Sequence, residues 1–364
     1  MAGVYISYPF CAQKCTYCNF ASGVATRRLQ EEYLEALGEE IRGHIWQWRP
    51  ETVYLGGGTP SAMEEEALAR LFEALPDARW LEATIEAAPG GITARKARAW
   101  RRAGITRVSL GVQSFVAGEI ARTGRKHTAA IVAAEVALLR DAGIAGINID
   151  LIAGLAGQTR SSWIESLAWV DRVEPEHVSV YMLEVDDDSR LGREILAGGA
   201  RYGAREVPVE DTVAELYELA VDELARQGLA RYEISNFARP GHESRHNRKY
   251  WLREPYAGFG ADAHSFDGQR RWQNVESARE YVERRRAGRS PAMEATPAQA
   301  DQERFFLGLR LSEGILPHAE EWLRWREPIE GFLSAGLIER HGDRLKLSRR
   351  GVLLSNEVFQ EFVQ

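Results

Sequence analysis

The chain has very few cysteines, and all of them lie together. Its 364 residues contain Cys11, Cys15 and Cys18 and no other cysteine. This excludes a framework of several disulfides. A structural zinc site would need a fourth ligand, normally with a second Cys or His pair further along the chain. A [4Fe–4S] cluster accepts three thiolates and leaves one iron open, so the spacing favours a cluster over three ordinary buried thiols.

The sequence also lacks a positive surplus and long apolar runs. The formal net charge is -7, so we expect no broad attraction for nucleic acid or an anionic membrane. No apolar stretch approaches the ~20 residues that span a bilayer. The chain opens without a basic region followed by an apolar run, so we expect no secretion signal. These absences, with an oxygen-sensitive cluster, predict a cytoplasmic protein.

Short β-branched runs alternate with helical patterns over the first half of the chain. The expected strands are Val4–Tyr8, Val53–Gly56, Ala83–Ala87, Arg107–Val112, Ile147–Ile152 and His177–Met182. The expected helices are Leu29–Trp48, Glu65–Leu75, Ala94–Ala103, Ala129–Ala142 and Ser161–Val170. Such alternation predicts an α/β fold with a parallel sheet and right-handed crossovers. Six units fit a partial (β/α)6 barrel, whose working residues would lie at the C-terminal ends of the strands.

The chain divides into three expected regions. Residues 1–200 would form the partial barrel, 201–292 an extension, and 293–364 a small C-terminal α+β domain that resembles a winged helix. A DNA-binding winged helix needs a basic surplus. Residues 320–364 hold seven Lys or Arg against eight Asp or Glu, so we expect a packing or docking role.

The cysteine segment resembles the radical S-adenosylmethionine (SAM) superfamily, whose signature is Cys-x3-Cys-x2-Cys with an aromatic before the last Cys. The resemblance implies that the three cysteines hold three irons, that SAM chelates the fourth, and that Tyr17 lies beside the cluster. The flanks, Tyr5–Cys11 and Cys18–Phe20, resemble the oxygen-independent coproporphyrinogen III oxidase family. Within that family they resemble the HemW-type haem chaperones most.

The resemblance also implies a SAM site built from successive strand ends. The three consecutive glycines after the second strand, Gly56 to Gly58, would let a ligand approach the backbone closely, although they could instead form only a tight turn. Glu86 interrupts an apolar strand and needs a partner, which a structural salt bridge could supply. Arg125 could instead be a solvated surface residue. The expected SAM-binding residues are Tyr5, Tyr17, Gly57, Gly58, Thr59, Glu86, Gln113, Arg125 and Asp150.

Four positions depart from the family pattern. Ala88 stands where Asn is usual, which removes one local hydrogen bond. Ala153 and Ala156 stand in place of Tyr and Pro, so we expect a less rigid loop after the fifth strand. Asp262 replaces a customary Gly. If that position needs a positive φ, Asp tolerates it better than most residues.

A second constellation lies in the C-terminal half, at His246-Asn247-x-x-Tyr250-Trp251. A lone His is usually structural, but an imidazole beside aromatic rings can coordinate haem iron. The segment matches the His-Asn-x-x-Tyr motif of the haem-chaperone branch. The resemblance implies haem binding by His246, with Asn247 and Tyr250 as groups that orient the ring.

Three functions follow from the resemblance. The first is a haem chaperone that carries a [4Fe–4S] cluster and SAM and passes haem to an apoprotein. The second is coproporphyrinogen III dehydrogenase, whose branch carries an N-terminal arm and a further Cys where this chain has Phe20. The third is another radical SAM enzyme, such as a methyltransferase. We expect the first, with no decarboxylation of coproporphyrinogen III. Peripheral contact with membrane proteins and a monomer or a cluster-dependent dimer are compatible with it.

Overall fold

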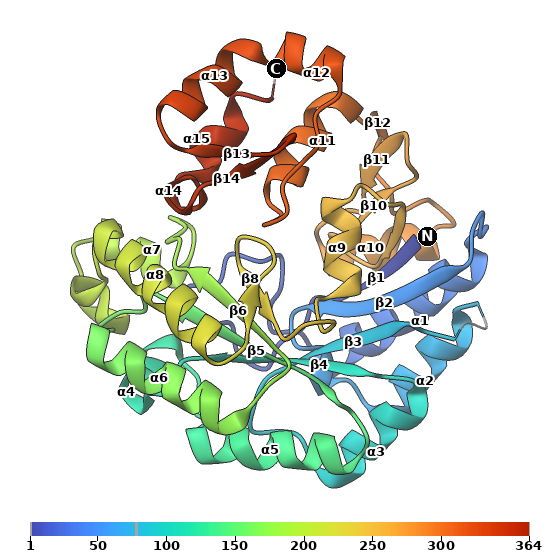
Figure 1. The fold of residues 1–364 in the computed structure, drawn as a ribbon. Coiled ribbons are helices and arrows are strands. Elements are labelled where there is room, and N and C mark those ends of the chain that lie inside the picture. Colours follow the sequence, from blue (N-terminus) through green and yellow to red (C-terminus); the bar gives the residue numbers. More distant parts are fainter. Residues whose placement is uncertain (1, 77–78, 364) are drawn as a thin grey trace.

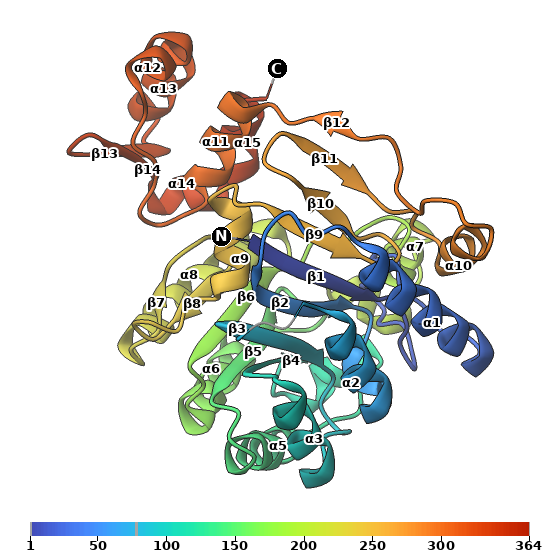
Figure 2. The same cartoon turned by 90° about the vertical axis from the view of Figure 1, so that its right-hand side faces the viewer.

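A curved, twelve-stranded sheet organises the protein (Figures 1 and 2). The structure is a computed structural model and describes residues 2–76 and 79–363. The central six strands are parallel and follow one another in chain order, which confirms the expected partial barrel. They are β1 (Ala2–Tyr8), β2 (Pro50–Gly57), β3 (Glu82–Ala87), β4 (Arg107–Gln113), β5 (Gly146–Ala153) and β6 (His177–Met182).

Helices cover the convex face of this sheet (Figure 1). The longer ones are α1 (Arg27–Gly43), α2 (Glu65–Ala74), α3 (Ala94–Ala103), α5 (Ala129–Asp141), α6 (Arg160–Val173) and α8 (Glu210–Arg226). Shorter turns of helix are η1 (Pro60–Ala62), α4 (Ala117–Thr123), α7 (Arg190–Leu196) and η2 (Arg201–Glu206). Threonine hydroxyls accept a backbone N–H at the starts of α1, α3, α5 and α6 and so satisfy first-turn donors.

Alternation along the strands sends apolar side chains outward to the helices and polar ones inward. Ile6, Leu55, Leu110 and Ile149, among others, are completely buried in the layer between sheet and helices. The inward positions include Thr52, Glu86 and Asp150. The apolar face is therefore the core, and the concave face is a polar lumen.

Both edges of the six-stranded sheet are extended by later parts of the chain. β9 (Tyr256–Phe259) joins β1 in parallel, and β10 (His264–Phe266), β11 (Arg270–Gln273) and β12 (Thr296–Pro297) continue from it. On the other side β8 (Asn236–Ala238) pairs with β6, and β7 (Ala230–Arg231) with β8. In the chain, α9 (Arg245–Trp251) lies between β8 and β9, and α10 (Ala278–Arg286) follows β11.

The chain ends in a small α+β domain, as expected. It contains α11 (Ala300–Leu309), α12 (Ala319–Arg324), α13 (Arg326–Ser334), β13 (Ile338–His341), β14 (Arg344–Leu347), α14 (Arg349–Leu353) and α15 (Ser355–Gln360). The two strands form the expected hairpin, and Gly342 takes a φ of 60° in its turn. Figure 1 shows this domain beside α9 and away from the outer helices α3 and α5.

The expected end of the first helix was wrong. The first helix was predicted to run to Trp48, but α1 ends at Gly43, and His44 is already extended with a ψ of 133°. The following aromatics are used in tertiary packing: Trp46 lies 5.7 Å from Phe259 of β9, centroid to centroid. Contact with a neighbouring strand outweighs the helical periodicity of this segment.

No helix in the described parts of the chain is both long and apolar enough to cross a membrane.

Adjacent residues on α6 test the assignment of the core. Trp163 is completely buried and donates its indole N–H to the Leu216 carbonyl at 2.8 Å, whereas Ile164 is partly exposed. Trp163→Ala should lower the free energy of unfolding by about 3–5 kcal/mol, because it removes a large core side chain. Ile164→Ala should change it by less than about 0.5 kcal/mol. Urea unfolding measures both, and equal effects would contradict the inside–outside assignment.

Candidate functional site

The lumen of the partial barrel is open at the C-terminal ends of its strands and closed at the other end. Near the open end, inward side chains keep partial exposure: Tyr5, Tyr54, Glu86, Asp150 and Tyr181. Near the closed end, inward side chains are buried: Thr52, Glu82, Arg107, Asn148 and His177. The accessible inward side chains therefore lie where the parallel strands finish, which is the usual place of a ligand site in such a barrel.

The three cysteines lie on the loop after β1, at the open end. Backbone bonds fold this loop, with Cys11 N–H donating to Gly23 at 3.0 Å and Cys18 N–H to Cys15 at 3.4 Å. Thr16 ties the loop to neighbouring elements, because it donates to Thr123 and accepts from Leu191. The loop therefore reaches across the open end as far as α7.

The thiols are free, half-buried and close enough to affect one another. Burial and the neighbouring Cys18 and Cys15 raise the pKa of Cys11. The described residues contain no group of three or more His, Cys, Asp or Glu side chains arranged around a single ion. In a [4Fe–4S] cluster each thiolate binds a different iron, so the three need not converge on one point.

Close backbone approach joins the cysteine loop to the glycine run that ends β2. A Cβ on Gly58 would lie 2.5 Å from the Phe10 carbonyl oxygen, so this contact requires glycine. Gly58 N–H donates to Tyr8 and Thr59 N–H to Phe10, both at 2.8 Å. These amides are used within the protein and do not face a ligand. Together with three thiols on one loop, this cradle fits a cluster held beside the strand ends.

Arg125 is not a solvated surface residue. Its Nη1 donates to the Gly111 carbonyl at 2.8 Å, and its Nε is buried without a partner. Burial opposes its charge, but Tyr17 and Cys15 raise the Arg125 pKa. The guanidinium therefore lies against the cysteine loop and the end of β4, with a donor still unused.

Glu86 is the carboxylate at the centre of the lumen. Its Oε1 accepts from the Tyr54 hydroxyl at 3.0 Å, and its Oε2 accepts from Gly57 N–H at 3.2 Å. Burial and the charge of Asp150 raise the Glu86 pKa to about 7, although both hydrogen bonds act in the opposite direction. The partners of Glu86 are neutral donors, so the charge of this carboxylate remains available for a cation.

Asp150 and Gln113 complete this group at the open end. Asp150 accepts from Ser109 at 3.0 Å and from Asn148 at 2.7 Å, yet burial raises its pKa. Gln113 has a φ of 71° and is buried where β4 ends beside Gly111. A non-glycine residue in the left-handed region is costly and is common at functional sites.

The closed end of the lumen is filled by α9, which carries the His-Asn-x-x-Tyr-Trp motif. The Glu82 carboxylate accepts from Ser244 Oγ at 3.1 Å and from the backbone N–H groups of Arg245 and His246 at 2.9 and 3.0 Å. A buried carboxylate with three donors holds the first turn of α9 firmly in place.

His246 points into the lumen with both ring nitrogens engaged. Nδ1 lies 2.9 Å from Thr52 Oγ1, and Nε2 lies 2.8 Å from the Tyr250 hydroxyl. Burial and the nearby Lys249 and Arg107 lower the His246 pKa to about 3, so the imidazole is neutral. Asn247 is half-buried in the first turn, where its N–H donates to Ser244 Oγ at 3.2 Å.

The C-terminal domain packs on the outer side of α9. The Arg310 guanidinium lies 4.3 Å from the ring centroid of Trp251, and it also pairs with the buried Glu233 at 3.2 Å. Arg248 pairs with Glu313 at 3.1 Å. The motif helix is thus enclosed between the lumen and the C-terminal domain (Figure 2).

The structure brings the predicted SAM residues together toward the open end of the lumen and the predicted haem residues toward its closed end, with Tyr250 facing Tyr5 and Glu86 where the two groups meet. The cysteine loop, glycine run, Glu86, Gln113, Arg125 and Asp150 lie at the open end. His246, Asn247 and Tyr250 lie at the closed end.

The departures from the family pattern have local structural consequences. Asp262 has a φ of 62°, and its Oδ1 accepts from Gln273 at 2.5 Å, so an Asp occupies the left-handed position. The Ala88 N–H finds a partner in Ser61 Oγ at 3.2 Å. The loop that contains Ala156 is tied by Arg122, which donates to the Ala156 carbonyl at 2.8 Å.

Sequence reasoning missed several inward residues of the lumen, among them Tyr54, Glu82 and Arg107. Alternation along the second strand places Tyr54 on the same face as Gly56, and this was the available signal. The roles of Glu82 and Arg107 depend on α9, which is far away in sequence and could not be inferred from the strand pattern.

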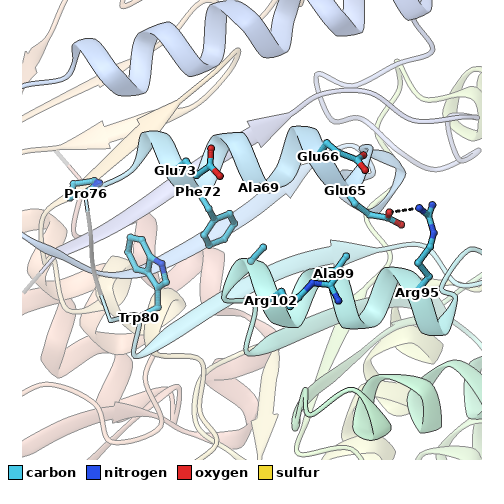
Figure 3. Close-up of a pocket in the computed structure, with 11 residues that line it drawn as sticks. Glu65, Glu66, Ala69, Phe72, Glu73, Pro76, Trp80, Arg95, Ala99 and Arg102 are labelled. Carbon is cyan, nitrogen blue, oxygen red and sulfur yellow. Dashed lines mark ion pairs between the residues drawn. The ribbon is translucent and has the colours of Figure 1, made fainter.

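A groove of about 590 Å³ lies elsewhere, between α2 and α3 on the outer face. Figure 3 shows Phe72 and Trp80 at one end of it and the Glu65–Arg95 ion pair, 2.9 Å long, at the other. None of the predicted site residues lines this groove, so it is not the candidate site.

Comparison with known proteins identifies the family of this chain. The model of the Radical SAM superfamily matches residues 5–170, and that of the HemN C-terminal domain matches residues 295–354. A heme chaperone HemW of Bacillus subtilis is 32% identical over 100% of this chain and 99% of its own length. The chain belongs to the HemW branch of the radical SAM superfamily. HemW of Mycobacterium tuberculosis is 35% identical, over 98% of this chain and 93% of its own.

The fold is shared with a solved enzyme of the wider family. Coproporphyrinogen III oxidase (HemN) from Escherichia coli matches with a TM-score of 0.85 and 20% identity, over 99% of this chain and 89% of that one. This similarity shows the fold alone. Membership of the radical SAM superfamily implies a [4Fe–4S] cluster and SAM.

The raised pKa of Glu86 predicts a stability cost in the cofactor-free protein. The pKa lies near 7 in the folded state, above its ordinary 4.5, so folding favours the protonated form. The folded state therefore carries no penalty from Glu86 below about pH 4.5, where the carboxyl is protonated in the folded and the unfolded chain. The penalty grows as the pH rises, and it is complete above about pH 7, where the carboxylate is charged in both states. Glu86→Gln should therefore raise the free energy of unfolding by about 1–2 kcal/mol at pH 8, after allowance for partial exposure, and change it little at pH 5.

Urea unfolding of cluster-free protein at both pH values measures this effect. Glu66→Gln, on the outer helix α2, is the matched control and should show no such pH dependence. An equal effect of Glu86→Gln at pH 5 and pH 8 would contradict the assignment.

Proposed function

We propose that the protein is a haem chaperone, which binds haem and transfers it to an acceptor protein. The observation that carries the proposal is similarity to heme chaperones along essentially the whole chain, with a buried His-Asn-x-x-Tyr-Trp helix attached to a radical SAM fold. The acceptor would be an apoprotein that lacks its haem. A monomer or a cluster-dependent dimer is compatible with this function.

Cys11, Cys15 and Cys18 would hold the [4Fe–4S] cluster. When bound, the cluster supplies an open iron that SAM can chelate and a centre for electron transfer. The half-buried loop would limit solvent access to the cluster, and Tyr17 and Arg125 would lie beside it.

The open end of the lumen would hold SAM. Glu86 and Asp150 provide negative charge for its cationic groups, and hydrogen bonds from Tyr54 and Ser109 orient these carboxylates. The other residues proposed for this site are Tyr5, Tyr17, Gly57, Gly58, Thr59, Gln113 and Arg125.

His246 would be the haem ligand. Both of its ring nitrogens have partners within the protein, so coordination of iron requires loss of at least one of them. Tyr250 would lose or change its bond to Nε2, and Asn247 would help to orient the ring. Haem binding is therefore expected to change the position of α9.

The cluster assignment is tested by replacing one thiol. Cys18→Ala should lose most of the charge-transfer absorption at the blue end of the visible spectrum after anaerobic reconstitution, because no other cysteine can replace the lost ligand. Asn19→Ala, an exposed neighbour on the same loop, should reconstitute normally. Full iron and sulfide content in Cys11→Ala, Cys15→Ala and Cys18→Ala combined would refute the assignment.

The haem assignment is tested by titration of the reconstituted protein with haem. His246→Ala should shift the Soret band and weaken binding by at least ~10-fold, because it removes the axial imidazole. His264→Ala, an exposed histidine on β10, should bind haem like the unaltered protein. An unchanged spectrum and affinity in His246→Ala would show that haem binds elsewhere.

A direct assay distinguishes a haem chaperone from a coproporphyrinogen III dehydrogenase. Phe20, 66% exposed, occupies the position where that branch has a further Cys. The reduced, reconstituted protein should leave coproporphyrinogen III unchanged. Formation of protoporphyrinogen IX would overturn the proposed function in favour of the enzyme.

A further inference from the structure

Tyr54 lies between the two ends of the lumen. It is the inward residue of β2 that follows Thr52, and only Leu55 separates it from the glycine run. The side chain is half-buried, since it faces the accessible part of the lumen on one side and α9 on the other. Tyr54 hydrogen-bonds Glu86 and stacks on His246, whereas Tyr250 hydrogen-bonds His246 and only faces Glu86.

Toward the open end, Tyr54 fixes the central carboxylate. Its hydroxyl donates to Glu86 Oε1 at 3.0 Å, while Gly57 N–H holds Oε2 at 3.2 Å. Its ring also stacks on Tyr5 with a centroid distance of 6.2 Å and an interplanar angle of 20°. The Tyr54 hydroxyl is thus one of two donors that set the orientation of Glu86.

Toward the closed end, Tyr54 contacts the motif helix. Its ring stacks on His246 with a centroid distance of 5.3 Å and an interplanar angle of 30°. His246 is held there by Thr52 and Tyr250. The His246 ring also packs closely on the backbone of β1, since a Cβ added to Gly3 would lie only 3.1 Å from His246 Cε1.

We propose that Tyr54 is a positioning residue that orients Glu86 for SAM and makes SAM binding depend on the state of His246. The inference rests on the proposed function, since it takes Glu86 as a SAM contact and His246 as the haem ligand. When His246 leaves its partners to coordinate iron, Tyr54 loses its stacking surface and Glu86 loses a fixed donor. Haem therefore weakens SAM binding, and SAM weakens haem binding by the same factor.

The test uses anaerobically reconstituted, unreduced protein, so that SAM is not consumed. Calorimetry gives the SAM dissociation constant with and without one equivalent of haem. Tyr54→Phe keeps the ring and its stacking but removes the hydroxyl, which should raise the dissociation constant about tenfold. In the unaltered protein haem should raise it about five- to tenfold. In Tyr54→Phe haem should raise it by less than twofold.

The pH profile separates positioning from general damage. The Tyr54 hydroxyl lowers the Glu86 pKa, so Tyr54→Phe should move the pH at which SAM binding weakens to a higher value. Other groups that face Glu86 stay in place in this variant, and they are Tyr5 of β1, Asp150 of β5, Tyr181 of β6 and Tyr250 of α9. A structural defect alone would lower affinity without moving the profile.

Tyr217→Phe is the matched control. The hydroxyl of this buried tyrosine of α8 donates to the Ile234 carbonyl, away from Glu86, so the Tyr217→Phe protein should bind SAM like the unaltered protein. Unchanged SAM affinity in Tyr54→Phe would refute the positioning role. Weakened SAM binding with the full effect of haem retained would refute the dependence on His246. Absence of haem binding in the unaltered protein would refute the proposed function instead.

Discussion

The Glu82 carboxylate is the interaction on which the arrangement of the lumen depends. It is the first residue of β3 and accepts hydrogen bonds from the first turn of α9, 162 to 164 residues later in the chain. Because Glu82 is buried, loss of these donors would leave a charge without partners, which is strongly destabilising. The same contact closes the N-terminal end of the barrel and aims His246 at Thr52 and Tyr54. One carboxylate thereby fixes both the shape of the lumen and the position of the motif.

The lumen then has two chemically different ends. Cysteines, glycines, Glu86 and Asp150 lie where the parallel strands finish, and a neutral imidazole with its tyrosine lies where the strands begin. Arg107, buried beside this imidazole with Nη2 unpartnered, is a cation near the carboxylates and lowers the pKa of Asp150. A metal cofactor with SAM and a haem ligand can therefore belong to one barrel without competing for the same donors. Their influence on each other would pass through the residues between them.

Local patterns predicted most of the fold, and tertiary contacts decided the rest. Period-two alternation and the glycine run located the six strands and the residues at their ends, because each strand end is a local feature. The predicted end of the first helix was wrong because Trp46 packs on Phe259, which lies over 200 residues away in the sequence. The motif at His246 was recognised, but its place at the closed end was not, since it follows from Glu82. Tyr54 was missed because its two partners come from different elements.

The most direct test of the account is hydrogen exchange of α9 as haem binds. The structure holds residues 244–251 against the sheet through Glu82 and Thr52, while His246 also bonds Tyr250 within the helix, and coordination of iron by His246 requires some of these contacts to break. Backbone amides of this segment should therefore exchange at a different rate once one equivalent of haem is bound, while α3 and α5 on the outer face should not change. Stoichiometric haem binding with unchanged exchange throughout residues 244–251 would contradict the account.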